Sequence, residues 1–424
     1  MKPNLLIVDE YSDLTEDLSA CISANYDVFS LETIAAAKSR MPSAQVMTLD
    51  IAISNFSSEQ LLKYINEHKQ SDSVILVVRR VTKFPAPLSF IDEGETFIIA
   101  EIGGNHEGDF EYAKKLLRDA AETGAQAVKF QIYKGDTIVS KVEGADRNKH
   151  FKKFELSHQQ YEELAKLANE SGLQFMASLW DSEAIDKFDP LIDIHKVGSG
   201  DFTNYPLLKK LALTDKPLIL ATAMSNLDEI RETVAFIDSI NPKLREEHKL
   251  CLMQCVAMYG EPEDRHAQLG AIKVLQEGFP DIHIGYSDHT LGTYACELAI
   301  GMGARVIEVH FTDDKTREFR DHHLSITKEE MKDLVAKSKK IATLFGSVEK
   351  VPVAAIETVE RVQQFRRAVY PAHDIKAGTI LTEEMLTTLR PNKGIDARKY
   401  YDLIGKTISK DVRAFEALAE EWIE

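Results

Sequence analysis

A carboxylate at the end of an apolar run is the first feature of this sequence that points to chemistry. In FIIAEIGGNHEG, residues 97–108, apolar side chains precede Glu101, and a glycine-bearing turn with Asn105, His106 and Glu107 follows it. Ionised carboxylates are seldom left in an apolar strand unless they are paired or used. Because barrel enzymes build their active sites at the carboxyl ends of strands, we expect Glu101 to belong to an active site.

Polar side chains at a spacing of two occur in two further apolar runs. Lys129 and Gln131 lie in AVKFQIY, and Glu308 and His310 lie in VIEVHF. Because side chains alternate along a strand, the two members of each pair point to the same side. These four side chains are therefore predicted to face a common interior.

Two other apolar runs end in segments that suit anion and metal binding. They contribute the polar residues Ser287, Asp288 and His289 in GYSDHT, and Lys196, Ser199 and Asp201 in HKVGSGDFTNYP. Lysine ammonium groups and serine hydroxyls suit phosphate and carboxylate. Two histidines from neighbouring strands, His289 and His310, suit a divalent metal such as Mn2+ or Mg2+ with open positions for water and substrate. A lone histidine is usually structural, but the coincidence predicts a metal-dependent enzyme for a small anionic, phosphorylated compound.

The elements that must position these residues alternate regularly. Apolar runs typical of buried strands occur at 97–101, 127–131, 173–177, 193–197, 217–221, 249–254, 282–286 and 305–309. Amphipathic stretches typical of helices occur at 111–122, 158–170, 205–213, 226–238, 265–277, 291–302 and 327–344. Eight strands alternating with helices predict a (β/α)8 TIM barrel over residues 91–345, with an open doubly wound sheet as the alternative.

The segments before and after the predicted barrel have different patterns of apolar and turn-forming residues. The sequence of residues 1–90 predicts a small α/β extension, with strands at 4–8, 46–49 and 74–78 and helices at 12–24 and 58–68. This extension weakly resembles part of a response-regulator receiver, with Asp50 at the phosphoacceptor position. Residues 346–365 predict a mostly helical linker. Residues 366–424 contain short β-like segments and turn signals, which indicate a third, compact domain.

Composition narrows the class of protein. The 424 residues are 44% hydrophobic and 28% charged, which is ordinary for a soluble globular chain. No apolar run reaches the roughly 18 residues of a membrane helix, so we expect a cytoplasmic protein with no membrane partner. A net charge of −17 argues against nucleic acid as a partner. The four cysteines lack the paired spacing of zinc sites and fit a reducing compartment.

Several motifs in order resemble the sialic acid synthase family. These are FIIAEIGGNHEGDFEYAKKLLRDAAETGAQAVKFQIY, KVGSGDFTNYPLL, IGYSDHTLG and ARVIEVHFT, with RDHHLS downstream. In the tail, RRAVY, DIKAGTILTEEML and RPNKGI resemble the family's antifreeze-like (SAF, β-clip) domain. The resemblance implies condensation of phosphoenolpyruvate with an N-acyl hexosamine, such as N-acetylmannosamine or a close relative, to a nonulosonic acid.

The resemblance also implies roles for individual residues. Phosphoenolpyruvate contacts fall on Lys129, Ser178, Lys196, Ser199 and Ser287, and metal ligation falls on His289 and His310. Sugar contacts fall on Gln131, Tyr259, Asp321 and Arg390, the last from the small domain of a second chain in a domain-swapped homodimer. Catalytic or orienting roles fall on Glu101, Asp201 and Glu308.

Departures from the family pattern leave the substrate open. Ala221 and Ala257 stand where relatives carry hydroxyl or amide side chains, and Trp180 lies in MASLWD, where bacterial relatives carry STPFD. The sugar could therefore be 6-phosphorylated, or the chain could be a legionaminate- or pseudaminate-type synthase or another 3-deoxy-ulosonate synthase. A regulatory barrel without turnover is the alternative from another class, but it would have no need of the Glu101, Lys129 and histidine set.

Overall fold

The computed structural model describes residues 4–8, 27–31, 45–51, 73–80, 88, 90–91, 95–319, 321–346 and 350–424. The chain divides into two units, residues 1–345 and 346–424.

The N-terminal segment contains a parallel sheet of four strands, β1 (Asn4–Val8), β2 (Asp27–Leu31), β3 (Gln45–Ile51) and β4 (Ser73–Arg80). Three of them match the predicted strands, whereas β2, DVFSL, was not predicted. The strand order is β2-β1-β4-β3, so β4 and not β3 pairs with β1. A receiver has the order 2-1-3-4-5. The receiver resemblance therefore does not extend to the topology, and Asp50 lies on the outer strand. The helices predicted at 12–24 and 58–68 lie outside the described residues.

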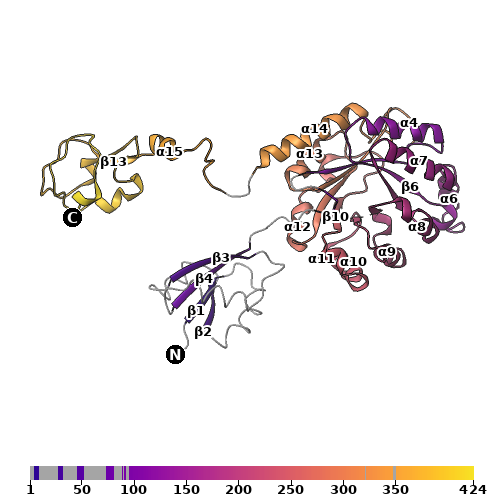
Figure 1. Cartoon of the computed structure of the whole chain (residues 1–424), viewed down its shortest axis with the longest axis horizontal. Coiled ribbons are helices and arrows are strands. Elements are labelled where there is room, and N and C mark those ends of the chain that lie inside the picture. Colours follow the sequence, from indigo (N-terminus) through magenta and orange to yellow (C-terminus); the bar gives the residue numbers. More distant parts are fainter. Residues whose placement is uncertain are drawn as a thin grey trace. The chain divides into compact units, whose positions relative to one another are not determined.

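Eight parallel strands form the barrel, as predicted, and helices surround it (Figure 1). The strands are β5 (Phe97–Gly103), β6 (Ala127–Ile132), β7 (Gln174–Leu179), β8 (His195–Val197), β9 (Leu218–Ala221), β10 (Leu250–Cys255), β11 (His283–Asp288) and β12 (Val306–His310). Their order, β7-β6-β5-β12-β11-β10-β9-β8, follows the sequence around the ring, and β7 lies against β8 to close it. Nearly every strand residue is buried, because helices cover one face and barrel side chains fill the other.

The longer surrounding helices bury apolar residues that recur at helical spacing. The surrounding helices are α4 (Phe110–Ala121), α5 (Gly135–Ile138), α6 (Ala145–Lys152), α7 (His158–Glu170), α8 (Ser182–Phe188), α9 (Tyr205–Ala212), α10 (Leu227–Ile240), α11 (Lys243–Glu246), α12 (Ala271–Gly278), α13 (Tyr294–Gly301) and α14 (Lys328–Phe345). Of these, α4, α7, α8 and α10 begin behind a side-chain cap. Ser157 and Asn226 form capping boxes at α7 and α10, and Asp109 caps α4. Leu116 and Leu117 of α4 are among the side chains packed against the strands.

The amino-terminal end of the barrel is filled by side chains, including some that precede β5. Leu88 and Ile91, which are 2% and 9% exposed, join a cluster with Phe97, Met176 and Met253 inside the ring. Leu88 falls in the range 1–90 that the sequence assigned to the N-terminal extension. The barrel core therefore begins a few residues earlier than that boundary.

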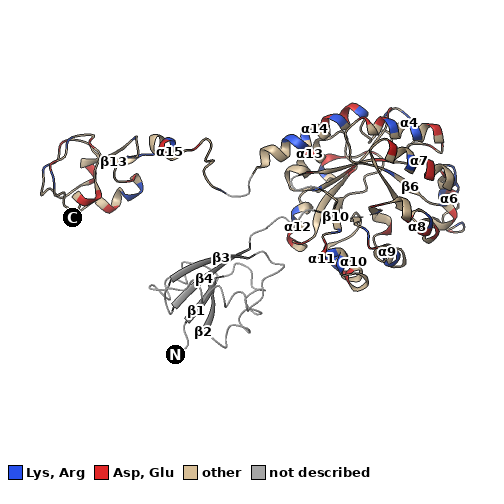
Figure 2. Cartoon of the chain, viewed as in Figure 1, with Lys and Arg blue, Asp and Glu red and all other residues tan. Residues whose placement is uncertain are grey.

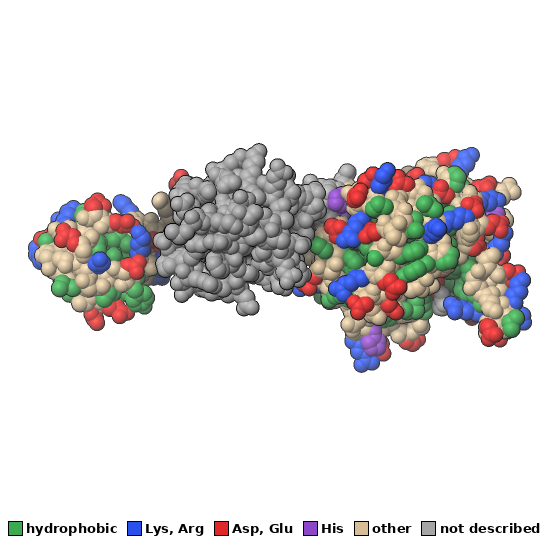
Figure 3. Space-filling model, turned by 90° about the horizontal axis from the view of Figure 1, so that it is seen from below, with side chains coloured by type: hydrophobic (Ala, Val, Ile, Leu, Met, Phe, Trp, Pro, Cys, Tyr) green, Lys and Arg blue, Asp and Glu red, His purple; other side chains and the backbone are tan. Residues whose placement is uncertain are grey.

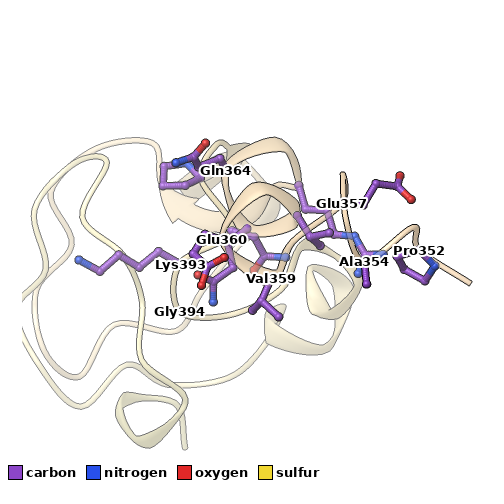
Figure 4. A pocket seen from close by; sticks show the side chains of 13 residues that line it. Pro352, Ala354, Glu357, Val359, Glu360, Gln364, Lys393 and Gly394 are labelled. Carbon is purple, nitrogen blue, oxygen red and sulfur yellow. The ribbon is translucent and has the colours of Figure 1, made fainter.

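The C-terminal unit has its own core. It contains α15 (Val359–Phe365), the antiparallel strands β13 (Ala368–Pro371) and β14 (Leu386–Leu389), and several 3-10 turns. A pocket of about 860 Å3 opens between α15 with its preceding loop and residues 391–394 (Figure 4). None of the predicted barrel residues lines it.

Residues of both charges occur throughout the described units. Basic and acidic side chains both occur along the helices around the barrel (Figure 2) and intermingle on the face shown in Figure 3. In the described part of the chain, no helix is both long and apolar enough to cross a membrane.

Candidate active site

The polar residues predicted from the strands gather at the carboxyl end of the barrel because strand register places them side by side. Lys129 on β6 pairs in register with Glu101 on β5, and Glu101 in turn pairs with His310 on β12. On the next pair of strands, Ser287 of β11 lies beside Glu308 of β12. All five side chains are buried. The expectation of a common interior is confirmed for these residues.

Two lysines and two glutamates form the centre of the site. Lys129 Nζ lies 2.6 Å from Glu101 Oε2 and 3.7 Å from Glu308 Oε2, and Lys196 Nζ lies 3.1 Å from Glu308 Oε1. Buried charges are tolerated in this way, since each ammonium faces a carboxylate. The four side chains, which we call the Lys–Glu cluster (Glu101, Lys129, Lys196, Glu308), carry no net charge when all are ionised.

Two members of the cluster, Glu308 and Lys129, keep their charges at neutral pH. Burial alone would raise the pKa of Glu308, but the ammonium groups of Lys129 and Lys196 outweigh it and lower the pKa to about 2. Burial would lower the pKa of Lys129, and the carboxylates of Glu101 and Glu308 raise it above its usual value. Glu308 is therefore an ionised carboxylate under working conditions and cannot serve as a proton donor.

Hydroxyl and amide groups surround the cluster. Lys129 Nζ donates to Ser178 Oγ over 3.3 Å, and Ser287 Oγ donates to Glu308 Oε1 over 3.1 Å. Gln131 Nε2 donates to Glu101 Oε1 over 2.9 Å. These contacts bring Ser178, Ser287 and Gln131 to the charged centre. An anion that bound here would find ammonium and hydroxyl donors together.

Ser199 and Asp201 lie in the 3-10 turn that follows β8. Ser199 Oγ accepts a hydrogen bond from the backbone N–H of Ala223, so the turn is tied to the end of β9. Asp201 accepts from Asn204 Nδ2 over 3.1 Å, and burial raises the pKa of its carboxyl group. Because the pKa of Asp201 is raised whereas that of Glu308 is lowered, Asp201 is better suited than Glu308 to exchange a proton.

The two predicted metal ligands lie together beside the Lys–Glu cluster, and His310 pairs in register with Glu101. The rings of His289 and His310 are 5.3 Å apart between centroids, and the ring of Tyr259 is 4.7 Å from that of His289. His310 Nδ1 is buried and has no hydrogen-bond partner among the described residues. Cys255 Sγ lies 3.7 Å from His289 Nδ1. The described residues hold no group of three or more metal-ligating side chains. The unpartnered nitrogen of His310 beside the His289 ring is nevertheless the kind of donor pair that suits a metal held by two imidazoles, with its remaining positions left to water and substrate.

Comparison with known proteins identifies the family. The NeuB family model matches residues 116–350, and the SAF domain model matches residues 366–419. The chain belongs to the NeuB family. It is 37% identical to the N,N'-diacetyllegionaminic acid synthase of Legionella pneumophila over 77% of this chain and 94% of that protein. It is 33% identical to the human N-acetylneuraminate-9-phosphate synthase over 77% of this chain and 92% of that protein.

Solved structures agree with this assignment. The N-acetylneuraminic acid synthetase of Leptospira borgpetersenii, crystallised with citrate, is 28% identical, with a TM-score of 0.59 over 65% of this chain and 94% of that one. A putative spore coat polysaccharide biosynthesis protein E from Chromobacterium violaceum is 26% identical, with a TM-score of 0.63 over 78% and 100%. The NeuB family chain described here is thus a sialic acid synthase-like enzyme with a barrel and a C-terminal SAF domain, as its sequence predicted.

Three further candidate residues of the NeuB barrel and SAF domain have other described surroundings. Asp288 accepts hydrogen bonds from Tyr286 and Thr290, so it serves as a structural acceptor, and burial raises its pKa. Asp321, in the loop after β12, is buried. Arg390 belongs to the C-terminal unit, where its guanidinium lies 5.7 Å from the centre of the Phe365 ring.

The sequence reasoning missed two features of this NeuB family site. The Cys255 thiol lies beside His289, and burial raises its pKa to about 11, so it stays protonated. With Ala221 and Ala223 it forms a small apolar patch at the ends of β9 and β10. The strand spacing places Cys255 and Met253 on one side, which was the available signal for an inward-facing thiol.

Proposed function

We propose that the chain condenses phosphoenolpyruvate with the open-chain form of an N-acyl hexosamine to give a nonulosonic acid and inorganic phosphate. The observation that carries this proposal is the Lys–Glu cluster beside the pair His289 and His310 at one end of the barrel. The cluster supplies ammonium groups for an anion, and the imidazoles supply a place for a cation that can hold an aldehyde. Relatives named as legionaminic acid and N-acetylneuraminate-9-phosphate synthases support the same reaction class.

The anion would be held by Lys129 and Lys196, with the hydroxyls of Ser178, Ser199 and Ser287. In the ligand-free site both lysines face carboxylates. Binding therefore requires that phosphate and carboxylate oxygens share or replace these ion pairs. Because the cluster itself is neutral, the charge of phosphoenolpyruvate needs a further positive group, which a divalent cation would provide.

His289 and His310 would hold that cation, Mn2+ or Mg2+, and when bound it would act as a Lewis acid that polarises the sugar aldehyde. Tyr259, whose ring lies against His289, would contact the sugar beside it.

The bond changes balance without any further reagent. The π electrons of phosphoenolpyruvate form a bond from C3 to the aldehyde carbon, whose oxygen takes a proton and becomes a hydroxyl. The cation left at C2 is stabilised by the ionised carboxylate of Glu308. Water adds to C2 and loses one proton, which leaves a hydroxyl at C2. The C2–O bond to phosphate then breaks, and the hydroxyl proton passes to the departing phosphate, so that the 2-keto acid and inorganic phosphate remain. Glu101 orients the reactants through Lys129 and Gln131, and Asp201 is suited to exchange the proton.

The acceptor sugar and the site of action follow from chemistry. We propose an N-acyl hexosamine of the N-acetylmannosamine type, with its 6-phosphate as a competing acceptor. Phosphoenolpyruvate is an intracellular metabolite, so the activity fits the cytoplasm.

Phosphate release from phosphoenolpyruvate, measured across a panel of free and 6-phosphorylated N-acyl hexosamines, tests the proposal. We expect release with at least one acceptor, loss of release with EDTA, and recovery with Mn2+ or Mg2+. His310→Ala should abolish release, whereas His373→Ala, an exposed histidine of the C-terminal unit, should not. Full activity in His310→Ala would refute the metal assignment, and no release with any acceptor would refute the reaction.

A further inference from the structure

One buried hydrogen-bond donor at the barrel mouth has no role in the site described so far. The indole Nε1 of Trp180 is buried and has no hydrogen-bond partner among the described residues, while the side chain as a whole is half-buried. An unsatisfied buried donor is unfavourable, and such groups in native proteins usually await a water or a ligand. The question is which ligand the position of Trp180 favours.

Strand geometry places this donor over the anion-binding side of the site. Trp180 directly follows β7, and its backbone N–H donates to the carbonyl of Ile132 over 3.2 Å. Ser178 lies two residues earlier in the extended chain, so the two side chains share a direction. Nε1 is also the nearest atom to the position that a Cβ on Gly198 would occupy, at 3.8 Å. Gly198 precedes Ser199, so the indole N–H lies at the seam between β7 and β8, next to two serines of the anion set.

Aromatic neighbours fix the direction of the indole ring. The ring of Tyr133 stacks on it with centroids 5.0 Å apart and planes 15° apart, and Phe151 meets it edge-on at 6.1 Å. A ring held on two sides cannot easily turn its N–H toward another partner. The donor is therefore preorganised, which lowers the entropic cost of binding.

We propose that the Trp180 indole N–H donates a hydrogen bond to an anionic oxygen of bound phosphoenolpyruvate. This inference rests on the proposed function. The metal candidates His289 and His310 and the sugar candidate Tyr259 belong to the arc from β10 to β12, whereas Trp180 lies at the β7–β8 seam. The sugar candidate Gln131 on β6 lies nearer to Trp180, so the test must separate the two substrates. A neutral donor also suits the Lys–Glu cluster, since it binds an anion without requiring another counter-charge. Trp180 is thus a binding residue for the anionic substrate.

Trp180→Phe removes the N–H and keeps an aromatic ring against Tyr133, and the composition of the chain provides a matched control. The protein has only two tryptophans, Trp180 and Trp422, and Trp422 lies in a 3-10 turn of the C-terminal unit. The full-length Trp422→Phe protein therefore has a single tryptophan that reports on the site. We would titrate it with phosphoenolpyruvate, inorganic phosphate and pyruvate, and follow its fluorescence.

The same ligands would be titrated by calorimetry into Trp422→Phe and into the double variant Trp180→Phe/Trp422→Phe. We expect a saturable fluorescence change with phosphoenolpyruvate, and affinity about tenfold weaker in the double variant, as for one hydrogen bond to a charged group. In steady state the KM for phosphoenolpyruvate should rise by a similar factor while the KM for the sugar stays unchanged. Sensitivity to phosphate or to pyruvate identifies the oxygen that accepts the bond.

Equal phosphoenolpyruvate affinity in the two proteins, with turnover intact, would overturn the inference and leave the proposed function standing. A change confined to the KM for the sugar would overturn it as well. If Trp422→Phe binds phosphoenolpyruvate but releases no phosphate with any sugar, the proposed reaction fails while the hydrogen bond is still measured. Absence of binding to Trp422→Phe would overturn both.

Discussion

At the scale of single residues, the ion pair between Lys129 and Glu101 is the most demanding contact of the site. Both side chains are 2% exposed and their charged atoms lie 2.6 Å apart. Removing one partner of a buried pair leaves an uncompensated charge and costs about 3–5 kcal/mol, whereas an exposed pair contributes about 0–1 kcal/mol. The stability of the barrel and its chemistry therefore depend on the same four side chains.

This contrast gives a prediction for Lys129→Met. We expect the free energy of unfolding to fall by about 3–5 kcal/mol, with most of the loss recovered in Lys129→Met/Glu101→Gln, because the stranded carboxylate is then neutral. Lys134→Met, which breaks the exposed pair with Glu183 at 3.0 Å, should change it by less than about 1 kcal/mol. Urea unfolding followed by circular dichroism measures all three. Equal losses in Lys129→Met and Lys134→Met would show that the buried pair contributes no more than a surface pair.

His106 predicts the pH dependence of stability. Burial lowers the pKa of its imidazole to about 4 from 6.5, so the folded protein keeps it neutral where the unfolded chain takes a proton. The stability it contributes is complete above pH 6.5 and is lost as pH falls toward 4, by roughly 3 kcal/mol in total.

Unfolding free energies of the wild type and of His106→Gln between pH 7.5 and 4 would check this effect. The slope over that window should be shallower in His106→Gln, whatever its absolute stability. His373→Gln, at an exposed histidine, should keep the slope of the wild type. Identical slopes in all three proteins would mean that His106 does not carry the effect.

At the scale of elements, the barrel strands and five of the seven predicted helix starts were predicted well, and two helix starts were not. Each of the eight barrel strands lies within two residues of its predicted start, because a parallel strand is a continuous apolar run. The helix predicted at 265–277 begins only at Ala271, since Gln268 has a φ of 51° that no helix tolerates. The helix predicted at 291–302 begins at Tyr294, after Gly292 with a φ of 79°. The spacing of apolar residues in the sequence does not reveal these backbone turns.

The candidate site was predictable where its residues lie on the strands, and it was not predictable where the contacts depend on the backbone beyond the strands. Alternation within a strand put Lys129 and Gln131 on one side of β6, and Glu308 and His310 on one side of β12. The parallel register with β5 then brought Lys129 and His310 next to Glu101. Side-chain alternation and strand register could not predict that Asp288 would accept hydrogen bonds from Tyr286 and Thr290. Those bonds depend on which face of the strand end turns toward α13. The Trp180 donor was out of reach because an unsatisfied atom appears only in three dimensions.

One element of the C-terminal unit gives a sharp prediction. Gly394 has a φ of 85°, and a Cβ there would lie 2.0 Å from the carbonyl oxygen of Leu418. Gly378 has a similar φ of 83° with nothing within 4 Å. Gly378→Ala should cost about 1–2 kcal/mol for the left-handed backbone alone, whereas Gly394→Ala should cost several kcal/mol more because backbone must move.

Trp422 lies in the same unit, so its fluorescence in a Trp180→Phe background reports thermal unfolding of that unit. A melting temperature lowered equally by the two alanine variants would show that the chain near Leu418 adjusts freely, contrary to the expectation.

At the scale of the whole molecule, the C-terminal unit carries a residue, Arg390, that the family resemblance assigns to the sugar site. We propose that it completes the site of a second chain in a homodimer. The connecting residues from 346 to the start of α15 at Val359 can span tens of ångströms when extended.

Mixing two inactive chains tests this proposal. Arg390→Ala and Glu101→Ala are each expected to lose activity, and heterodimers should regain one intact site, for about a quarter of the wild-type activity after random exchange. Mixing Arg390→Ala with Lys129→Met should give the same recovery, since the defects again lie in different units. Verified heterodimers without any recovered activity would place Arg390 and Glu101 of one chain in the same site.

The neutral Lys–Glu cluster has a further consequence, for the speed of substrate capture. Its lysines have internal partners, the protein has a net charge of −17, and acidic and basic side chains intermingle on the described part of the face in Figure 3. In the absence of a bound cation, we therefore expect the cluster to exert no long-range attraction on a distant anion, whose diffusional encounter is then not steered. Added salt should leave the association rate unchanged or raise it slightly by screening repulsion, the reverse of the behaviour of an exposed basic funnel. Such an enzyme recognises its anion by exchange at contact and not by a long-range field.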